Sequence, residues 1–231
     1  MIERIYSLSY METYQIIINN ETIEYDVDFK RMKSIHLKVV DGKLLIKAPL
    51  HTPLSLIEKN IYKYQHKLIP QIQRYEPYYN YCNDGYVDIF SLRYFLKVRD
   101  VGRRKCELHD NVLYVYHNSI DKCVENYLKS LLLNYIEERV IYYLAYDFDL
   151  DMPKIEVRKY KGRWGSCFYK ENKISFNLSL VHLDKELIDY VIVHELTHFL
   201  QANHSPLFYQ EMQKRLPDYK QRQKKLKEKH V

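Results

Sequence analysis

The segment Lys185–Leu200, with the sequence KELIDYVIVHELTHFL, decides the architecture of the second half of this chain. Its apolar residues recur around the whole circumference of a helix, so the spacing predicts a helix that runs through a core rather than along a surface. Asp184 is expected to be the N-cap of this helix. The apolar side chains that support the prediction are Leu187, Ile188, Val191, Ile192, Leu196, Phe199 and Leu200.

Within this helix, His194 and His198 are four residues apart. They therefore lie one turn apart on one face, where two imidazoles can bind a single zinc ion. Glu195 lies about 100° around the helix from His194, so its carboxylate can reach a water in an open coordination position rather than the metal. The alternative is a helix with surface histidines and no metal. It is disfavoured because unpaired polar groups among apolar neighbours are costly.

A catalytic zinc site needs a third protein ligand. His204 follows His198 by six residues, which lets the chain leave the helix and return an imidazole to the metal. Glu211 is the alternative third ligand, and we favour His204 over it. Ser205-Pro206 predicts a new helix just after His204, because a capping hydroxyl followed by Pro is typical of a helix N-terminus.

The segment 161–167 is the second unusual stretch, because it holds two of the five glycines and the only tryptophan. Gly in a strand pattern usually marks a bend or a close approach by another backbone, so a β-bulge with a core Trp is one interpretation. The other is an edge strand beside the metal, which binds an extended peptide as an added strand. Arg163 is then a candidate for stabilising an oxyanion or a substrate carboxylate. The candidate substrate-binding residues are Arg163, Trp164, Gly165 and Ser166.

The rest of the chain predicts an α+β fold with a domain boundary near residue 118. Residues 1–118 are expected to form a β-rich N-terminal domain. In it, alternating apolar residues flank Asp41-Gly42, a strong hairpin signal, and a helix is expected from Pro53 to about Arg74. Residues 119–231 are expected to begin with a long helix that ends near Tyr146. A small antiparallel sheet, the helix of the HExxH motif and a basic C-terminal helix should follow.

The net charge of +6 is concentrated near the C-terminus. Residues 214–231 hold eight Lys or Arg and two acidic residues, which accounts for the whole excess. A solvated basic helix is the favoured interpretation, and a nucleic-acid-binding arm is the alternative. The four cysteines form no CxxC pair and predict reduced thiols in a cytoplasmic protein. Neither a signal peptide nor a membrane-spanning segment is expected.

Several motifs together resemble the YgjP-like metallopeptidase family, a relative of the SprT-like and gluzincin-type zinc proteases. The resemblance extends upstream to residues 31–49 and covers most of the chain. It implies a zincin-like second domain with zinc bound by His194, His198 and His204, and with Glu195 as the general base. It implies no particular substrate. The motifs are Arg163–Cys167, Ile174–Asn177, His194–His198 and Asn203–Ser205 with Phe208.

The predicted function is therefore a zinc-dependent hydrolase, most specifically a metallopeptidase acting on a peptide or protein substrate with Glu195 as general base. One alternative is a zinc hydrolase of a nucleotide phosphate ester or anhydride, which clustered cations beside the metal would favour. Another is a nucleic-acid-associated binding protein with a structural zinc, in which the basic residues 214–231 contact the nucleic acid.

Overall fold

The computed structural model describes residues 10–229, which divide into two compact units, one ending at Pro77 and the other beginning at Tyr78. The boundary expected near residue 118 lies inside the second unit, so the first domain is shorter than expected. The reason is that strands before residue 118 share one core with the helix after it, instead of closing a core of their own. The strand side chains in this shared core include Val87, Ile89, Leu96, Leu113 and Val115.

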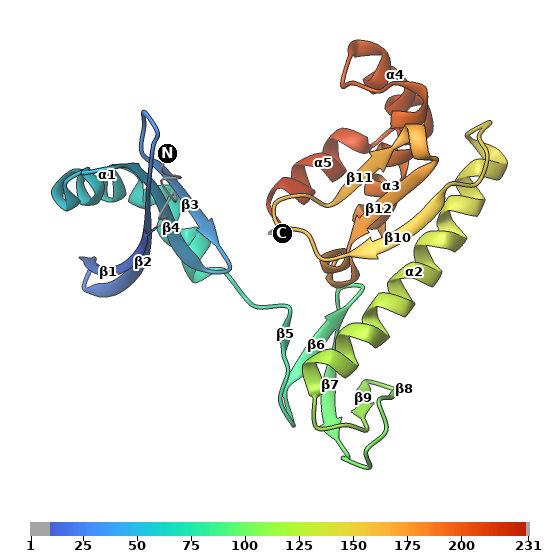
Figure 1. Cartoon of the computed structure of the whole chain (residues 1–231), viewed down its shortest axis with the longest axis horizontal. Coiled ribbons are helices and arrows are strands. Elements are labelled where there is room, and N and C mark those ends of the chain that lie inside the picture. The colour runs from blue at the N-terminus through green and yellow to red at the C-terminus, as the bar shows by residue number, and fades with distance from the viewer. Residues whose placement is uncertain (1–9, 230–231) are drawn as a thin grey trace, which may run out of the picture. The chain divides into compact units, whose positions relative to one another are not determined.

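The first unit is a four-stranded sheet with one helix (Figure 1). The strand order is β1-β2-β4-β3, in which β2 and β4 are parallel and the other neighbours are antiparallel. The hairpin predicted at Asp41-Gly42 is confirmed, and both residues have the left-handed backbone that it requires (φ 50° and 71°). The elements are β1 (Tyr10–Ile18), β2 (Glu21–Lys30), β3 (His36–Val40), β4 (Lys43–Pro49) and α1 (Leu54–Gln73), which is the helix predicted from Pro53.

The second unit holds a five-stranded sheet, a three-stranded sheet and four α-helices among the residues from Tyr78 to Lys229. The larger sheet has the order β5-β6-β7-β9-β8. Its strands are β5 (Tyr79–Asn80), β6 (Tyr86–Ile89), β7 (Leu92–Val98), β8 (Cys106–His109) and β9 (Val112–Val115). The remaining strands and helices are α2 (Ile120–Tyr146), β10 (Lys154–Arg158), β11 (Gly165–Phe168), β12 (Lys173–Asn177), α3 (Lys185–Leu200), α4 (Pro206–Arg215) and α5 (Tyr219–Lys227).

Helix α2 connects the two sheets of the second unit, because it contacts β8 and β9 near one end and β10 further along (Figure 1). This is the long helix predicted to end near Tyr146. Its apolar stripe repeats every four residues and is fully buried. No described helix is long and apolar enough to cross a membrane. The stripe consists of Val124, Leu128, Leu132, Ile136 and Val140.

The smaller sheet is mixed, so the prediction of an antiparallel sheet is wrong for one of its two strand pairs. Strand β12 is central, and it pairs antiparallel with β11 but parallel with β10. The reason is the path of the chain. After β10 it crosses to the far edge of the sheet and runs in the opposite direction as β11. It then turns again and enters between the two strands as β12, parallel to β10. Strand β11 therefore lies at an edge of the sheet, next to α3, as expected for the Trp164 segment.

Helices α2 and α3 are joined by a partly buried polar network around Asp189. The Asp189 carboxylate accepts two hydrogen bonds from the Arg139 guanidinium, at 3.0 and 2.9 Å. The hydroxyls of Tyr135 and Tyr143 also donate to it, at 2.9 and 3.2 Å. Because α3 carries the motif residues, this network helps to fix the position of the motif in the core.

We expect Asp189→Ala to lower the free energy of unfolding by about 2–4 kcal/mol, because it leaves the Arg139 charge and two hydroxyls without their shared acceptor. Chemical denaturation of the full chain measures this change. Glu138→Ala, an exposed substitution on α2, is the control and should change stability by less than about 0.5 kcal/mol. Equal stability of the two variants would show that the network contributes little.

Candidate metal centre

Helix α3 places His194 and His198 one turn apart, as the spacing predicts. The helix begins at Lys185 and its apolar side chains are buried, including Leu187, Ile188, Ile192 and Leu196. Asp184 precedes the helix, but its side chain makes no capping hydrogen bond. The helix position is instead determined by packing of its apolar sides, so that the two histidines emerge at the border of the core.

His204 returns to the same place from the connection between α3 and α4. The chain leaves α3 at Gln201 in an extended conformation (φ −139°), and α4 starts two residues after His204. Ser205 caps α4 by accepting a hydrogen bond from the Phe208 N–H, and Pro206 occupies the first turn, as predicted. The loop between the two helices is therefore short and fixed at both ends.

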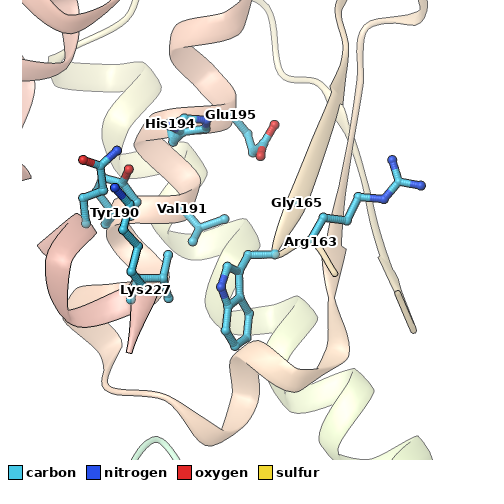
Figure 2. Close-up of a pocket in the computed structure, with 10 residues that line it drawn as sticks. Arg163, Gly165, Tyr190, Val191, His194, Glu195 and Lys227 are labelled. Carbon is cyan, nitrogen blue, oxygen red and sulfur yellow. The ribbon is translucent and has the colours of Figure 1, made fainter. Parts of the chain in front are cut away.

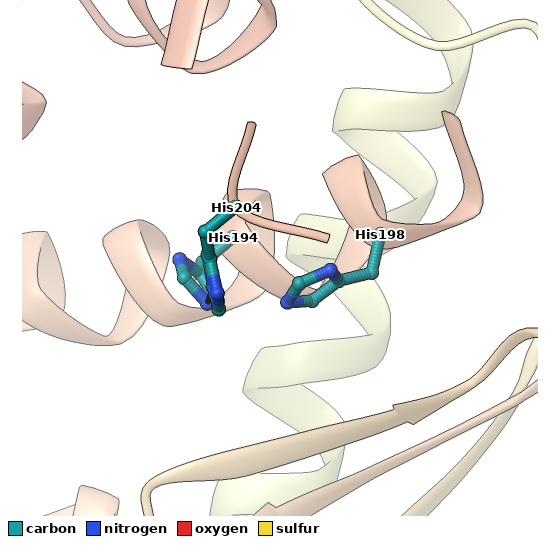
Figure 3. A group of neighbouring side chains, drawn as sticks. All are labelled: His194, His198 and His204. Atoms are coloured by element: carbon teal, nitrogen blue, oxygen red, sulfur yellow. Dashed lines mark hydrogen bonds between the residues drawn. The ribbon is translucent and has the colours of Figure 1, made fainter. Parts of the chain in front are cut away.

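The three imidazoles form a compact cluster (Figure 3). One ring nitrogen from each histidine lies within 4.8 Å of the others, and His204 Nε2 is 3.1 Å from His194 Nε2. The Phe208 ring packs against all three rings, with centroid distances of 4.7–5.0 Å. The sequence prediction that these histidines converge is thus consistent with the geometry. Phe208 forms the apolar back of the cluster.

Glu211, the alternative third ligand, is held elsewhere. Its carboxylate forms an ion pair with Arg215 one turn along α4, and this partner lowers the pKa of Glu211. The potential ligand group found among residues 10–229 consists of the three histidines.

The cluster suits a metal ion in its protonation as well as its geometry. His198 Nδ1 is 3.2 Å from the Gln201 carbonyl oxygen, so a proton on Nδ1 is donated there and Nε2 stays free as a ligand atom. Burial, together with the neighbouring His198 and His204, lowers the pKa of His194 to about 3. Burial also lowers the pKa of His198. Neutral imidazoles are the form that binds a metal, so the residues present fit a divalent cation such as zinc.

Glu195 is a buried carboxylate beside the cluster, with 5% of its surface exposed. Burial raises its pKa to about 8, although a hydrogen bond from the Cys167 N–H and the charge of Arg163 act in the opposite direction. Its Oε2 atom has no hydrogen-bond partner among the described residues. A buried and incompletely bonded carboxylate is costly, which is typical of a functional group rather than a structural one.

Gly165 on β11 makes room for Glu195. A Cβ atom at Gly165 would lie 2.6 Å from Glu195 Oε1 and 2.9 Å from two carbons of the same side chain. At Gly165 the close approach therefore comes from a side chain of α3 and not from another backbone. This contact joins the two unusual stretches of the sequence in one site.

The other residues of the Trp164 segment divide between the site and the surface. Trp164 and Gly165 line a pocket of about 310 Å³ together with His194 and Glu195. Arg163 contributes to the lining, but Figure 2 shows its side chain directed away from Glu195. Its guanidinium stacks on Tyr160 at 4.6 Å and donates a hydrogen bond to Ser166 Oγ. Ser166 is not among the lining residues.

The pocket is also lined by residues that no sequence motif indicates. Tyr190 and Val191 belong to α3, and Gln223, Leu226 and Lys227 belong to α5. Tyr190 precedes His194 by four residues, so the helical spacing that links the two histidines also places Tyr190 on their face. The α5 residues gave no such signal, because their position depends on how α5 packs on α3.

The family model described as a YgjP-like metallopeptidase domain matches residues 33–229. The chain therefore belongs to the YgjP-like family, and the resemblance found in its motifs is confirmed. The match begins after β1 and β2, so this hairpin lies outside it. A solved structure, the metallopeptidase zymogen abylysin of Pyrococcus abyssi, aligns with 42% of this chain and 99% of that chain, at 22% identity and a TM-score of 0.36. No curated protein matches the chain.

We expect Gly165→Ala to lower the free energy of unfolding by about 1–3 kcal/mol, because either Glu195 or β11 must move to accept the methyl group. Gly162→Ala is the matched control. No atom lies within 4 Å of a Cβ at Gly162, so this change should cost only the strain of a positive φ, about 1 kcal/mol. Urea denaturation compares the two. A Gly165→Ala protein as stable as the wild type would contradict the close packing of Gly165 on Glu195.

Proposed function

We propose that this chain is a zinc-dependent metallopeptidase. The observation that carries the proposal is that three imidazoles and one buried carboxylate meet at one place, formed by α3 and the loop that follows it. His194 and Glu195 also line the same pocket, so the carboxylate and the metal ligands are accessible to one substrate. Membership of the YgjP-like metallopeptidase family supports a peptidase over other hydrolases.

In this proposal His194, His198 and His204 would hold the zinc ion. Bound zinc supplies a Lewis acid that lowers the pKa of water and polarises a carbonyl group. Phe208 excludes water from behind the imidazoles, and the Gln201 carbonyl fixes the tautomer of His198.

Glu195 acts as the general base. Its Oε1 atom is held by the Cys167 N–H and packed against Gly165, while Oε2 has no partner among residues 10–229. The free oxygen is thus available to take a proton from the attacking water and to return it to the leaving amine. The hydrogen bond to β11 keeps the carboxylate oriented during both transfers.

Strand β11 binds the peptide backbone. Trp164 accepts a hydrogen bond from the Asn177 N–H on the β12 side, whereas the Cys167 N–H points to Glu195. Because successive residues of a strand direct their backbone groups to opposite sides, those of Gly165 face the open edge with those of Cys167. An extended peptide can pair there as an added strand. The segment 163–166 therefore contributes through its backbone more than through the Arg163 side chain.

The two alternative functions have less support. A phosphate-hydrolysing site would gather cations around the metal, but the Arg163 side chain points away and leaves Lys227 as the other basic residue of the pocket. A nucleic-acid arm would leave the basic segment free. Helix α5 instead buries Tyr219 and Leu226 and packs on α3. A structural zinc would be closed by a fourth protein ligand, whereas the group found in the described part of the chain has three.

Glu195→Gln should retain zinc and lose at least about 100-fold in peptide hydrolysis, because it removes the proton acceptor and leaves the three imidazoles in place. His194→Ala should lose both zinc and hydrolysis, because one ligand is missing. Elemental analysis measures the zinc content of each variant. Each variant is also incubated with a denatured protein substrate, and mass spectrometry of the released peptides measures hydrolysis.

His66→Ala serves as the control, since His66 is exposed on α1 of the first unit, and it should behave like the wild type. Full hydrolysis of a verified substrate by Glu195→Gln would refute the role of Glu195. Full zinc content in His194→Ala would refute the ligand assignment.

A further inference from the structure

The pocket beside Glu195 extends from the metal centre to helix α5. Its volume of about 310 Å³ is large enough for an amino-acid side chain. Its apolar lining comes from three parts of the chain. Trp164 immediately precedes β11, Val191 lies on α3, and Leu226 lies on α5. A substrate side chain that enters here would leave its backbone beside β11 and the metal ligands.

The α5 end of the pocket is polar. The Tyr190 hydroxyl forms a hydrogen bond with the Gln223 side chain, which links α3 to α5. Lys227 completes this end, as Figure 2 shows on the α5 side near Tyr190. Lys227 is exposed and has no ion-pair partner within the described range 10–229. The ammonium group is therefore available to a ligand.

Charge decides which ligand fits. Glu195 is the acidic residue of the pocket, and the Cys167 N–H holds it at the other end, next to His194. A purely apolar ligand would desolvate the Lys227 ammonium without giving it a partner, which is unfavourable. A ligand with a carboxylate on a short aliphatic stem suits both the apolar lining and the polar end of the pocket. The stem contacts Trp164 and Leu226, while the carboxylate pairs with Lys227.

We propose that this pocket binds a carboxylate of a peptide substrate, next to the bond that is cleaved, and that Lys227 is the residue that selects it. A glutamate side chain has the required stem and charge, and a free C-terminal carboxylate offers the same chemistry. The proposal rests on the peptidase function proposed above. It gives α5, the most basic helix of the chain, a role in substrate selection.

The test measures binding through Trp164, the only tryptophan of the chain, whose fluorescence responds to a ligand in this pocket. The zinc-loaded full chain with Glu195→Gln keeps the peptides intact during titration. The probes are the blocked peptide acetyl-Ala-Ala-Glu-Ala-amide, its Gln and Lys counterparts, and the Gln peptide with a free C-terminal carboxylate.

Lys227→Glu is compared with Lys224→Glu, which changes the net charge equally at an exposed α5 position outside the pocket. The parent protein should bind the Glu peptide, the free-carboxylate peptide or both about tenfold more tightly than the blocked Gln peptide. Lys227→Glu should abolish this preference and favour the Lys peptide, whereas Lys224→Glu should keep the preference. Which carboxylate peptide binds identifies the source of the carboxylate.

Equal affinity for all four peptides, or a carboxylate preference that survives Lys227→Glu, would overturn the proposal. Hydrolysis of the same peptides by the protein with Glu195 intact is measured in parallel. Cleavage without a Lys227-dependent preference refutes the pocket assignment alone. A Lys227-dependent preference without any cleavage supports the carboxylate site and counts against the peptidase function.

Discussion

The Glu195 carboxylate is buried in the second unit, and the surrounding structure is arranged to accept it. Burying a carboxylate is unfavourable unless hydrogen bonds or charges compensate for lost water. The Cys167 N–H provides one such bond, and Gly165 provides space that any larger residue would fill. Both residues belong to β11, so the position of this edge strand and the position of α3, which carries Glu195, depend on each other. The polar network at Asp189 joins α3 to α2.

Local spacing explains what could be predicted from the sequence. His194 and His198 are four residues apart on a helix whose apolar neighbours require burial, and Ser205-Pro206 marks the start of the next helix. These short-range signals place the three histidines close together without knowledge of the fold. The Asp41-Gly42 hairpin was predictable for the same reason, because the turn residues determine the backbone conformation.

Long-range packing explains what could not be predicted. The parallel pairing of β10 with β12 depends on how the chain crosses the sheet, and no local pattern reports it. The first unit ends at Pro77 and not near residue 118, because Leu96 and Leu113 are buried in the same core as the side chains of α2. The charge pattern of residues 214–231 predicts a solvated helix or a nucleic-acid arm. Its Leu226 is buried and its Lys227 lines the pocket, so one face of α5 forms part of the site.

The proposed metal centre is a zinc ion bound by three imidazoles with one position left open. X-ray absorption at the zinc edge of the metal-loaded full chain tests it most directly, because the spectrum gives the number and type of ligands. Three imidazole nitrogens and one further light atom are expected, at about 2.0–2.1 Å from zinc. A spectrum with sulfur ligands or a fourth imidazole, or a chain that binds no zinc, would contradict it.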